Sequence, residues 1–344
     1  MHRRRLTALL TTALLGAGAL VAAPFASAAT SHSPHPLDIS QAGHYLFVAN
    51  VQSAGIKIAE YDTSTGAYLR TLPLSILGAY PNVPMLATPT KFFIANDLGN
   101  LAEYDNATGN LVRTYQPPKA LASINDFFGG NLFSDGSTLY AVTWHFGDVV
   151  EISLSSGAVL GTTSTAWFGE LGAAHAGVIF TSDPAATQIT ATSATTGRHL
   201  WTTRWAPTGS NSLFGVTSLL VVKEGLLATA ASTSGAPARV ALINPATGAI
   251  ERQISYTGKG LVGPADSAYV NGQVFIYNQI LYQSASSVTQ IDPTTMSVVR
   301  TIATPANANP TRFTLAGTSA LFVTNPSSVT EYETSTGKLL ATFN

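Results

Sequence analysis

An all-β fold of repeated four-stranded antiparallel sheets is predicted by three features of the sequence. First, one hairpin-like segment recurs along the chain, from "EYDTSTGAYLRTL" at 60–72 to "EYETSTGKLLATF" at 331–343. Second, short runs rich in β-branched and aromatic residues precede the copies, as "LFVAN" does at 46–50. Third, the copies follow one another about every 45 residues, which is the spacing of β-propeller blades. We therefore expect a single seven-bladed β-propeller of four-stranded antiparallel blades.

The first 28 residues are interpreted as a signal peptide and not as part of the fold. A basic start precedes an apolar run over 9–25, and small residues end at Ala28, where we expect cleavage. Two adjacent arginines near the start leave both the general and the twin-arginine export routes open. We expect residues 29–35 to be a short disordered linker, residues 36–344 to form the propeller, and the mature protein to be secreted and extracellular.

The recurring segment is interpreted as the hairpin that joins the two outer strands of each blade. Glycine supplies the positive φ that such a turn demands, and Asp or Asn at its start accepts backbone hydrogen bonds. The turn glycines are Gly66, Gly109, Gly157, Gly197, Gly248 and Gly337, and the residues at the turn starts include Asp62, Asp105, Asn244 and Asp292. Met296 takes the glycine position of the sixth blade, where a left-handed non-glycine residue costs ~1–2 kcal/mol unless the turn changes type.

The two inner strands of each blade are expected upstream of the hairpin. The predicted second strands are 44–50, 91–97, 138–145, 177–183, 226–232, 273–279 and 320–325. First strands are expected further upstream, for example over 267–270 and 312–316. The first and last blades would be neighbours in a closed ring. Each terminus supplies its own strands, so closure does not require strand exchange.

The composition limits the classes of function. Charged residues are 10% of the chain, against a typical value of about 25%, and the net charge is −1. This balance excludes the basic surface that nucleic-acid binding requires. After the leader, no apolar run is long enough to enter a membrane as a helix. The absence of cysteine excludes disulfides, thiolate metal sites and a cysteine nucleophile, and we expect a monomer.

The repeats carry a family resemblance. "LFVAN" (46–50) and "LFVTN" (321–325), each followed by a strand and an "xDxxTGxxxxT" hairpin, resemble the YVTN-type propeller repeat. "ATTGRHLWTTRW" (194–205) is similar to the pyrroloquinoline-quinone (PQQ)-like repeat of quinoproteins. The resemblance covers residues ~36–344 and implies a secreted bacterial propeller. Such families include surface-binding proteins, lactonases, antibiotic lyases and quinoprotein dehydrogenases.

Two departures bear on the cofactor. The quinoproteins that the chain resembles carry a tryptophan in most repeats, and here only Trp201 fills that position. The adjacent cysteines that many of them have are absent. We therefore expect no PQQ and no resident cofactor, with a divalent cation (Ca²⁺ or Mg²⁺) as the open alternative.

Polar residues at the ends of the predicted second strands form the first group of candidate site residues. They are Asn50, Asn96, Asp97, His145, Asp183, Asn278 and Asn325. In a propeller these ends surround one mouth of the central channel, where such donors could hold a metal or a polar ligand. The structural alternative is that Asn and Asp end strands because they favour turns.

Predicted loops between blades supply the second group of candidates. They are 123–130 with Asp126, 166–175 with Trp167, Glu170 and His175, 203–211 with Arg204 and Trp205, and 257–266 with Asp266. If the protein is an enzyme, Asp126, Glu170, His175 and Asp266 are the candidate acid–base or cation-binding groups. Asp97, His145, Trp167, Asp183, Arg204 and Trp205 are the candidate ligand-binding residues. The structural alternatives are salt bridges and tryptophans packed between blades.

These observations favour a secreted, non-catalytic protein that binds a small molecule, or an extracellular protein or polysaccharide, through its channel-mouth loops. Two alternatives stay open. The first is a metal-assisted hydrolase or lyase of lactonase type, and the second is a PQQ-type oxidoreductase. No nucleophile elbow, zinc-binding helix or phosphate-binding glycine loop occurs in the sequence.

Overall fold

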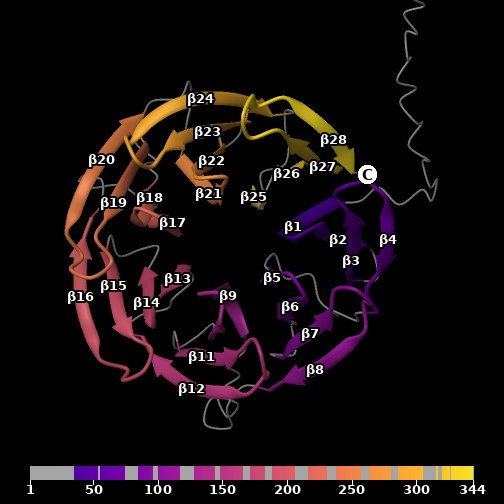
Figure 1. Cartoon of the computed structure of the whole chain (residues 1–344), viewed down its shortest axis with the longest axis horizontal. Helices are drawn as coiled ribbons and strands as arrows, with labels where there is room; N and C mark the ends of the chain where they lie inside the picture. The colour runs from indigo at the N-terminus through magenta and orange to yellow at the C-terminus, as the bar shows by residue number, and fades with distance from the viewer. Residues whose placement is uncertain are drawn as a thin grey trace, which may run out of the picture. The chain divides into compact units, whose positions relative to one another are not determined.

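The computed structural model describes residues 35–52, 55–73, 84–95, 100–116, 128–143, 148–165, 171–182, 188–205, 216–230, 238–256, 263–279, 286–304, 315–316, 320–325 and 327–343. All of these residues belong to the compact unit His32–Asn344. Every regular element among them is a β-strand, and the strands form seven four-stranded antiparallel sheets. Figure 1 shows the sheets as blades around a common centre. The predicted fold class is confirmed.

Each blade uses four consecutive strands, ordered from the centre of the wheel to its rim. Blades 1 to 4 consist of β1 His35–Ala42, β2 Tyr45–Gln52, β3 Gly55–Asp62, β4 Tyr68–Thr71; β5 Met85–Ala87, β6 Lys91–Ala95, β7 Leu101–Asp105, β8 Leu111–Tyr115; β9 Phe128–Ser134, β10 Thr138–Thr143, β11 Asp148–Ser153, β12 Val159–Ser164; and β13 Leu171–His175, β14 Val178–Ser182, β15 Gln188–Ser193, β16 His199–Arg204. Blades 5 to 7 consist of β17 Val216–Val222, β18 Gly225–Ala230, β19 Ala238–Ile243, β20 Ile250–Tyr256; β21 Gly263–Val270, β22 Gln273–Gln279, β23 Ser286–Asp292, β24 Ser297–Thr304; and β25 Leu315–Ala316, β26 Leu321–Asn325, β27 Ser328–Tyr332, β28 Leu339–Phe343.

The outer hairpin of each blade turns as the sequence predicts. In blade 1, the Asp62 carboxylate accepts the Ser64 N–H at 2.8 Å, and the Gly66 N–H donates to the Asp62 carbonyl at 2.8 Å. Gly66 has a φ of 71°. The pKa of Asp62 is lowered, chiefly by the hydrogen bond that its carboxylate accepts from the Ser64 hydroxyl. The polar groups of the turn therefore find their hydrogen-bond partners within the turn itself.

Met296 adopts the left-handed conformation that its position demands, with a φ of 51°. Its side chain is 4% exposed and packs in the apolar cluster between blades 5 and 6, with Val240 and Ile291 among its neighbours. Burying a methionine side chain contributes about 1.5–3 kcal/mol, which offsets a strain of ~1–2 kcal/mol. Packing therefore explains why a non-glycine residue is tolerated here.

Apolar clusters fill the seams between neighbouring blades. Between blades 1 and 2, the rings of Phe47 and Phe92 stack with centroids 4.2 Å apart. Between blades 7 and 1, Phe322 and Phe343 lie in one cluster with Tyr61, whose ring meets Phe343 edge-on at 5.5 Å. Blades 1 and 7 each have four strands of their own. The ring is thus closed by side-chain packing and not by strand exchange.

Every blade has a register shift at the same place, where the third strand meets the start of the fourth. Such a bulge leaves one residue of the rim strand unpaired and bends the edge away from other chains. The exposed large apolar side chains in the described part of the chain all lie at these strand starts: Tyr68, Leu69, Leu111, Val112, Val159, Leu160, Ile250, Val298, Val299, Leu339 and Leu340.

Candidate functional site at the loop end of the wheel

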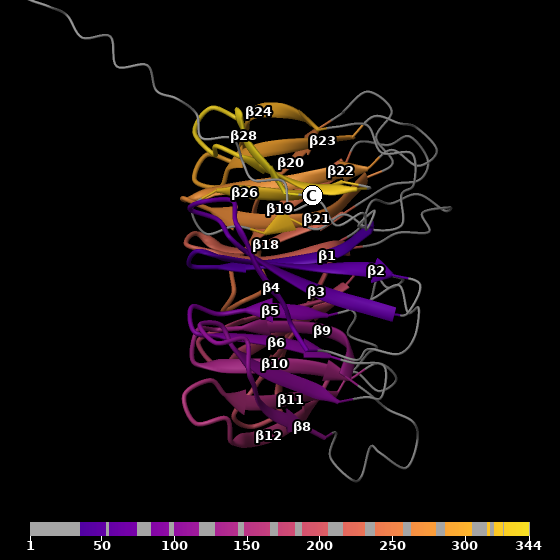
Figure 2. The same cartoon turned by 90° about the vertical axis from the view of Figure 1, so that its right-hand side faces the viewer.

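The two ends of the wheel differ in what connects the strands. Because strands alternate in direction, the connections from second to third strands and from one blade to the next leave from one end, called here the loop end. The first-to-second and third-to-fourth turns lie at the opposite end, the turn end. Figure 2 shows the strands from the side, running between the two ends. The candidate residues are placed below by the end at which they lie.

Asparagine occupies the same loop-end position in three consecutive blades. Asn278, Asn325 and Asn50 follow one another at the ends of β22, β26 and β2, and all three are buried. The Nδ2 groups of Asn278 and Asn325 donate to the hydroxyls of Thr289 and Thr330 at 2.8 and 3.0 Å. These side chains, which the sequence placed at the channel mouth, are held by the neighbouring third strand.

In blade 1, the equivalent asparagine has less support. Ala59 stands where blades 6 and 7 have threonine, so the Nδ2 group of Asn50 has only the Val48 carbonyl, at 3.5 Å. The Oδ1 atom of Asn50 is buried and accepts no hydrogen bond. Thr143 fills this position in blade 3, and its buried hydroxyl also lacks a partner. An unpaired buried polar atom costs about 1–3 kcal/mol, so both positions favour a ligand or water that hydrogen-bonds to them.

Polar residues also lie near the loop end of the innermost strands, as the fourth residue of β1, β9 and β21. The Oδ1 atom of Asp266 accepts the N–H of Ser267 at 2.7 Å. Asp38 and Asn131 make the same bond to the next residue at 2.8 Å in blades 1 and 3. All three side chains are partly exposed. Asp38 and Asn131 were not among the candidates predicted from the sequence, although each directly precedes an aliphatic residue that is buried in the first strand.

The structure does not bring His175 and Asp266 together. Leu171 of β13 lies at the level of Asp266 in β21, since their partners Ser182 and Tyr277 are each the fifth residue of the second strand. His175 is the last residue of β13 and is exposed at the turn end, about 13 Å further along the strand. The prediction that 166–175 is entirely a loop between blades was therefore wrong for Leu171–His175.

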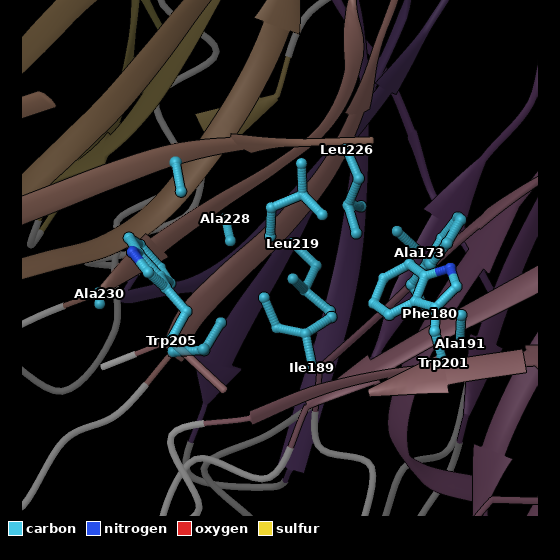
Figure 3. Close-up of a cluster of buried hydrophobic side chains, with 13 residues drawn as sticks. Ala173, Phe180, Ile189, Ala191, Trp201, Trp205, Leu219, Leu226, Ala228 and Ala230 are labelled. Carbon is cyan, nitrogen blue, oxygen red and sulfur yellow. The ribbon is translucent and has the colours of Figure 1, made fainter. Parts of the chain in front are cut away.

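Arg204 and Trp205 lie at the loop end of blade 4, in a part of 203–211 that we expected to be loop. Arg204 is the last residue of β16 and is exposed. The Trp205 indole is 4% exposed and lies at one end of the apolar cluster between blades 4 and 5, with Trp201 at the other (Figure 3). Its Nε1 group faces the Oε1 atom of Gln253 at 3.4 Å. Arg204 thus projects from a well-packed support.

The remaining candidates lie outside the described residues: Asn96, Asp97, Asp126, His145, Trp167, Glu170 and Asp183. Within the described part of the chain, no three His, Asp or Glu side chains gather closely enough to hold a metal ion. No helix in that part is long and apolar enough to cross a membrane.

Comparisons with known proteins identify the family. A comparison with curated proteins finds no match. Among solved structures, BamB from Moraxella catarrhalis is similar with a TM-score of 0.50 and 15% identity, covering 85% of this chain and 83% of that one. KlHsv2 with loop 6CD replaced by a Gly-Ser linker has a TM-score of 0.59 and 10% identity, covering 90% and 98%. At these identities the likeness shows the fold alone.

The family profile covers most of the propeller. The profile described as outer membrane protein assembly factor BamB matches residues 97–340. This range begins in blade 2 and ends in the last strand of blade 7. The chain belongs to this family of PQQ-like-repeat β-propellers.

Proposed function

We propose that this protein is an exported, non-catalytic scaffold that binds a partner protein at the loop end of its wheel. The observation that carries the proposal is the difference between the two ends. At the turn end, Asp62, Asp105 and Asn244 bind their own turns, which are alike from blade to blade. At the loop end, the equivalent second-strand position carries a buried asparagine in blades 1, 6 and 7 and a buried threonine in blade 3, so the polar groups there differ from blade to blade.

The chemistry of the loop end suits a polypeptide. Carboxamide and hydroxyl groups pair with peptide N–H and C=O groups without a net charge, and the whole chain has a net charge of only −1. Specific protein interfaces carry about one hydrogen bond per 100–200 Å². The family description names an assembly factor for outer membrane proteins, which supports a protein partner in the bacterial envelope. The leader that the sequence predicts at 1–28 supports export.

The proposal makes no use of a metal ion or a cofactor. Within the described residues, no three His, Asp or Glu side chains gather closely enough to hold a metal ion, and His175 lies at the turn end, away from Asp38 and Asp266. We therefore expect that neither Ca²⁺ nor Mg²⁺ changes the melting temperature of the purified protein. A rise of several degrees with either ion would favour a metal-dependent function.

A charge-reversal pair in blade 4 tests which end binds. Arg204 and Arg198 are both exposed and lie near the loop and turn ends of β16, respectively. The mature protein would be immobilised, incubated with detergent-solubilised envelope of the source cells, and the retained proteins quantified by mass spectrometry. We expect a partner that wild type and Arg198→Glu retain equally and that Arg204→Glu retains at least tenfold less.

Two outcomes would contradict the proposal. Either no protein is retained by wild type above the level of an unrelated propeller, or the retained protein is lost equally with both variants. Both arginines are on the surface, so we expect the fold of each variant to be intact. Circular dichroism of each variant would check this.

A further inference from the structure

Among the described residues, four seams between neighbouring blades carry a similar hydrogen bond near the rim. A side chain of the fourth strand donates to a carbonyl in the outer turn of the next blade. Arg70 donates to the Ala107 carbonyl at 2.9 Å and Arg113 to the Ser156 carbonyl at 2.8 Å. The Trp201 Nε1 group donates to the Pro245 carbonyl at 3.0 Å, and Arg252 donates to the Thr294 carbonyl. Guanidinium and indole groups keep these protons at every pH near neutrality.

The seam between blades 3 and 4 lacks such a donor. Gly161 of β12 pairs with Glu151, at the position where β4, β8, β16, β20 and β24 carry Arg or Trp and β28 carries alanine. The link is made by the Thr163 hydroxyl, which lies 3.2 Å from the Ala194 carbonyl in the outer turn of blade 4. The same hydroxyl lies 2.7 Å from the Oε1 atom of Glu151. A hydroxyl has one proton, so it cannot donate fully to both oxygens.

No cation neutralises Glu151 within the described residues. Its side chain is 9% exposed, and the titratable groups of its own blade that act on it are Asp135 and Tyr140. The turn of blade 4 that faces it is uncharged at 193–197. Arg198 and His199 follow that turn, are exposed, and form no ion pair with Glu151 among the described contacts.

We propose that Glu151, Thr163 and the Ala194 carbonyl form a pH-dependent latch between blades 3 and 4. When the carboxyl is ionised, the Thr163 proton points to Glu151 and the Ala194 carbonyl loses its donor. When the carboxyl takes a proton from solvent, its O–H donates to the Thr163 oxygen, and the Thr163 proton turns to Ala194. Protonation of Glu151 therefore closes the seam, and ionisation loosens it.

The acid–base properties of Glu151 agree with this geometry. Burial raises the pKa of Glu151, the Thr163 hydrogen bond opposes the rise, and Asp135 adds to it. The stabilisation from the protonated carboxyl is thus fully present below the ordinary pKa of 4.5 and is lost as the pH rises through the raised value.

The neighbouring seams supply natural controls. Thr203 occupies the position of Thr163 in blade 4, but Ala191 replaces the glutamate, and the Thr203 hydroxyl donates to the Gly248 carbonyl at 2.5 Å. A Cβ atom at Gly248 would lie 2.6 Å from the Thr203 hydroxyl, whereas one at Gly197 would meet nothing within 4 Å. The turn of blade 4 is therefore less tightly covered than the turn of blade 5.

Amide hydrogen exchange measured residue by residue tests the latch. The Gly197 and Gly248 N–H groups make the same turn bond, to the Ser193 and Asn244 carbonyls. In wild type, we expect the protection factor of Gly197, corrected for intrinsic exchange, to rise about two- to tenfold from pH 8 to pH 4.5. The protection factor of Gly248 should stay constant. Local exchange is the readout because burial also raises the pKa of Glu60 and Glu331, which affects global stability.

Three variants separate the latch from a purely structural role. Glu151→Gln donates to Thr163 at every pH, so Gly197 should be highly protected throughout. Thr163→Val removes the relay and should leave Gly197 weakly protected throughout, although Glu151 still titrates. Thr203→Val should keep the pH response of Gly197.

The proposal is overturned if wild-type Gly197 shows no pH response, if Gly248 responds equally, or if the response persists in Thr163→Val. The wild-type comparison stands even if a variant fails to fold.

Discussion

Replacing Gly248 by alanine is expected to lower the free energy of unfolding by about 2–5 kcal/mol. Gly248 has a φ of 74°, and a left-handed alanine costs ~1–2 kcal/mol. Its new Cβ atom would also lie 2.7 Å from the Trp201 ring and 2.6 Å from the Thr203 hydroxyl. Overpacking of this kind adds about 1–3 kcal/mol. Urea denaturation followed by tryptophan fluorescence measures the loss.

Gly197→Ala is the matched control, because Gly197 has the same turn position in the preceding blade. Its φ is 65°, but a Cβ atom there would meet nothing within 4 Å. Only the backbone strain of ~1–2 kcal/mol should remain. Equal losses of unfolding free energy for Gly248→Ala and Gly197→Ala would show that the fourth strand of blade 4 does not pack closely against the outer turn of blade 5.

Phe343→Ala is expected to destabilise the protein by about 3–5 kcal/mol, the usual cost of removing a buried phenylalanine. Phe343 is 4% exposed in the closing seam, with the rings of Tyr61 and Phe322 at 5.5 and 5.9 Å. The variant leaves a cavity between blades that no peptide connection joins directly. Calorimetry should show a lower melting temperature for the whole domain.

Leu340→Ala is the control for this experiment. Leu340 lies in the same strand, but its side chain is 50% exposed. Its removal should change the free energy of unfolding by no more than about 0.5 kcal/mol. A similarly small effect of Phe343→Ala would mean that the closing seam does not contribute to stability.

The blade architecture could be predicted from sequence because its signals are local and repeated. Asp62 and Gly66 specify a turn within a few residues, and the same pattern recurs in most blades. The exception at Met296 was also visible in the sequence, where two outcomes were open, and the φ of 51° shows that the backbone there is left-handed. What the sequence could not reveal is the packing that makes methionine acceptable there, because that depends on the neighbouring blade.

The placement of His175 shows where local signals fail. The segment "LGAAH" (171–175) has no β-branched or aromatic residue, so its propensity favours a loop. In the structure it is a strand because its small residues fit against blade 3. A Cβ atom at Gly172 would lie 2.1 Å from the Phe133 ring. Tertiary packing thus overrides propensity and carries His175 away from the loop end.

The hydrogen-bond partners of the loop-end asparagines could not be predicted either. Asn50 and Asn325 look equivalent in "LFVAN" and "LFVTN", but their support comes from the third strand. Thr330 binds the Asn325 amide at 3.0 Å, whereas Ala59 leaves Asn50 without a comparable partner. This difference depends on cross-strand register, which a single sequence specifies only indirectly.

The most direct test of the closed wheel is a distance measurement across its closing seam. The chain has no cysteine, so spin labels can be placed at two introduced cysteines alone. Leu340 in blade 7 and Tyr68 in blade 1 lie on either side of the closing seam. Leu69 in blade 1 and Leu111 in blade 2 occupy the same strand positions on either side of the seam between blades 1 and 2. All four side chains are exposed.

Double electron–electron resonance would compare the variant Leu340→Cys/Tyr68→Cys with the variant Leu69→Cys/Leu111→Cys. A closed ring of equivalent blades predicts overlapping, narrow distance distributions for the two pairs. A clearly longer or broader distribution for the pair across blades 7 and 1 would contradict closure. The loop end would then not form a continuous surface around the channel.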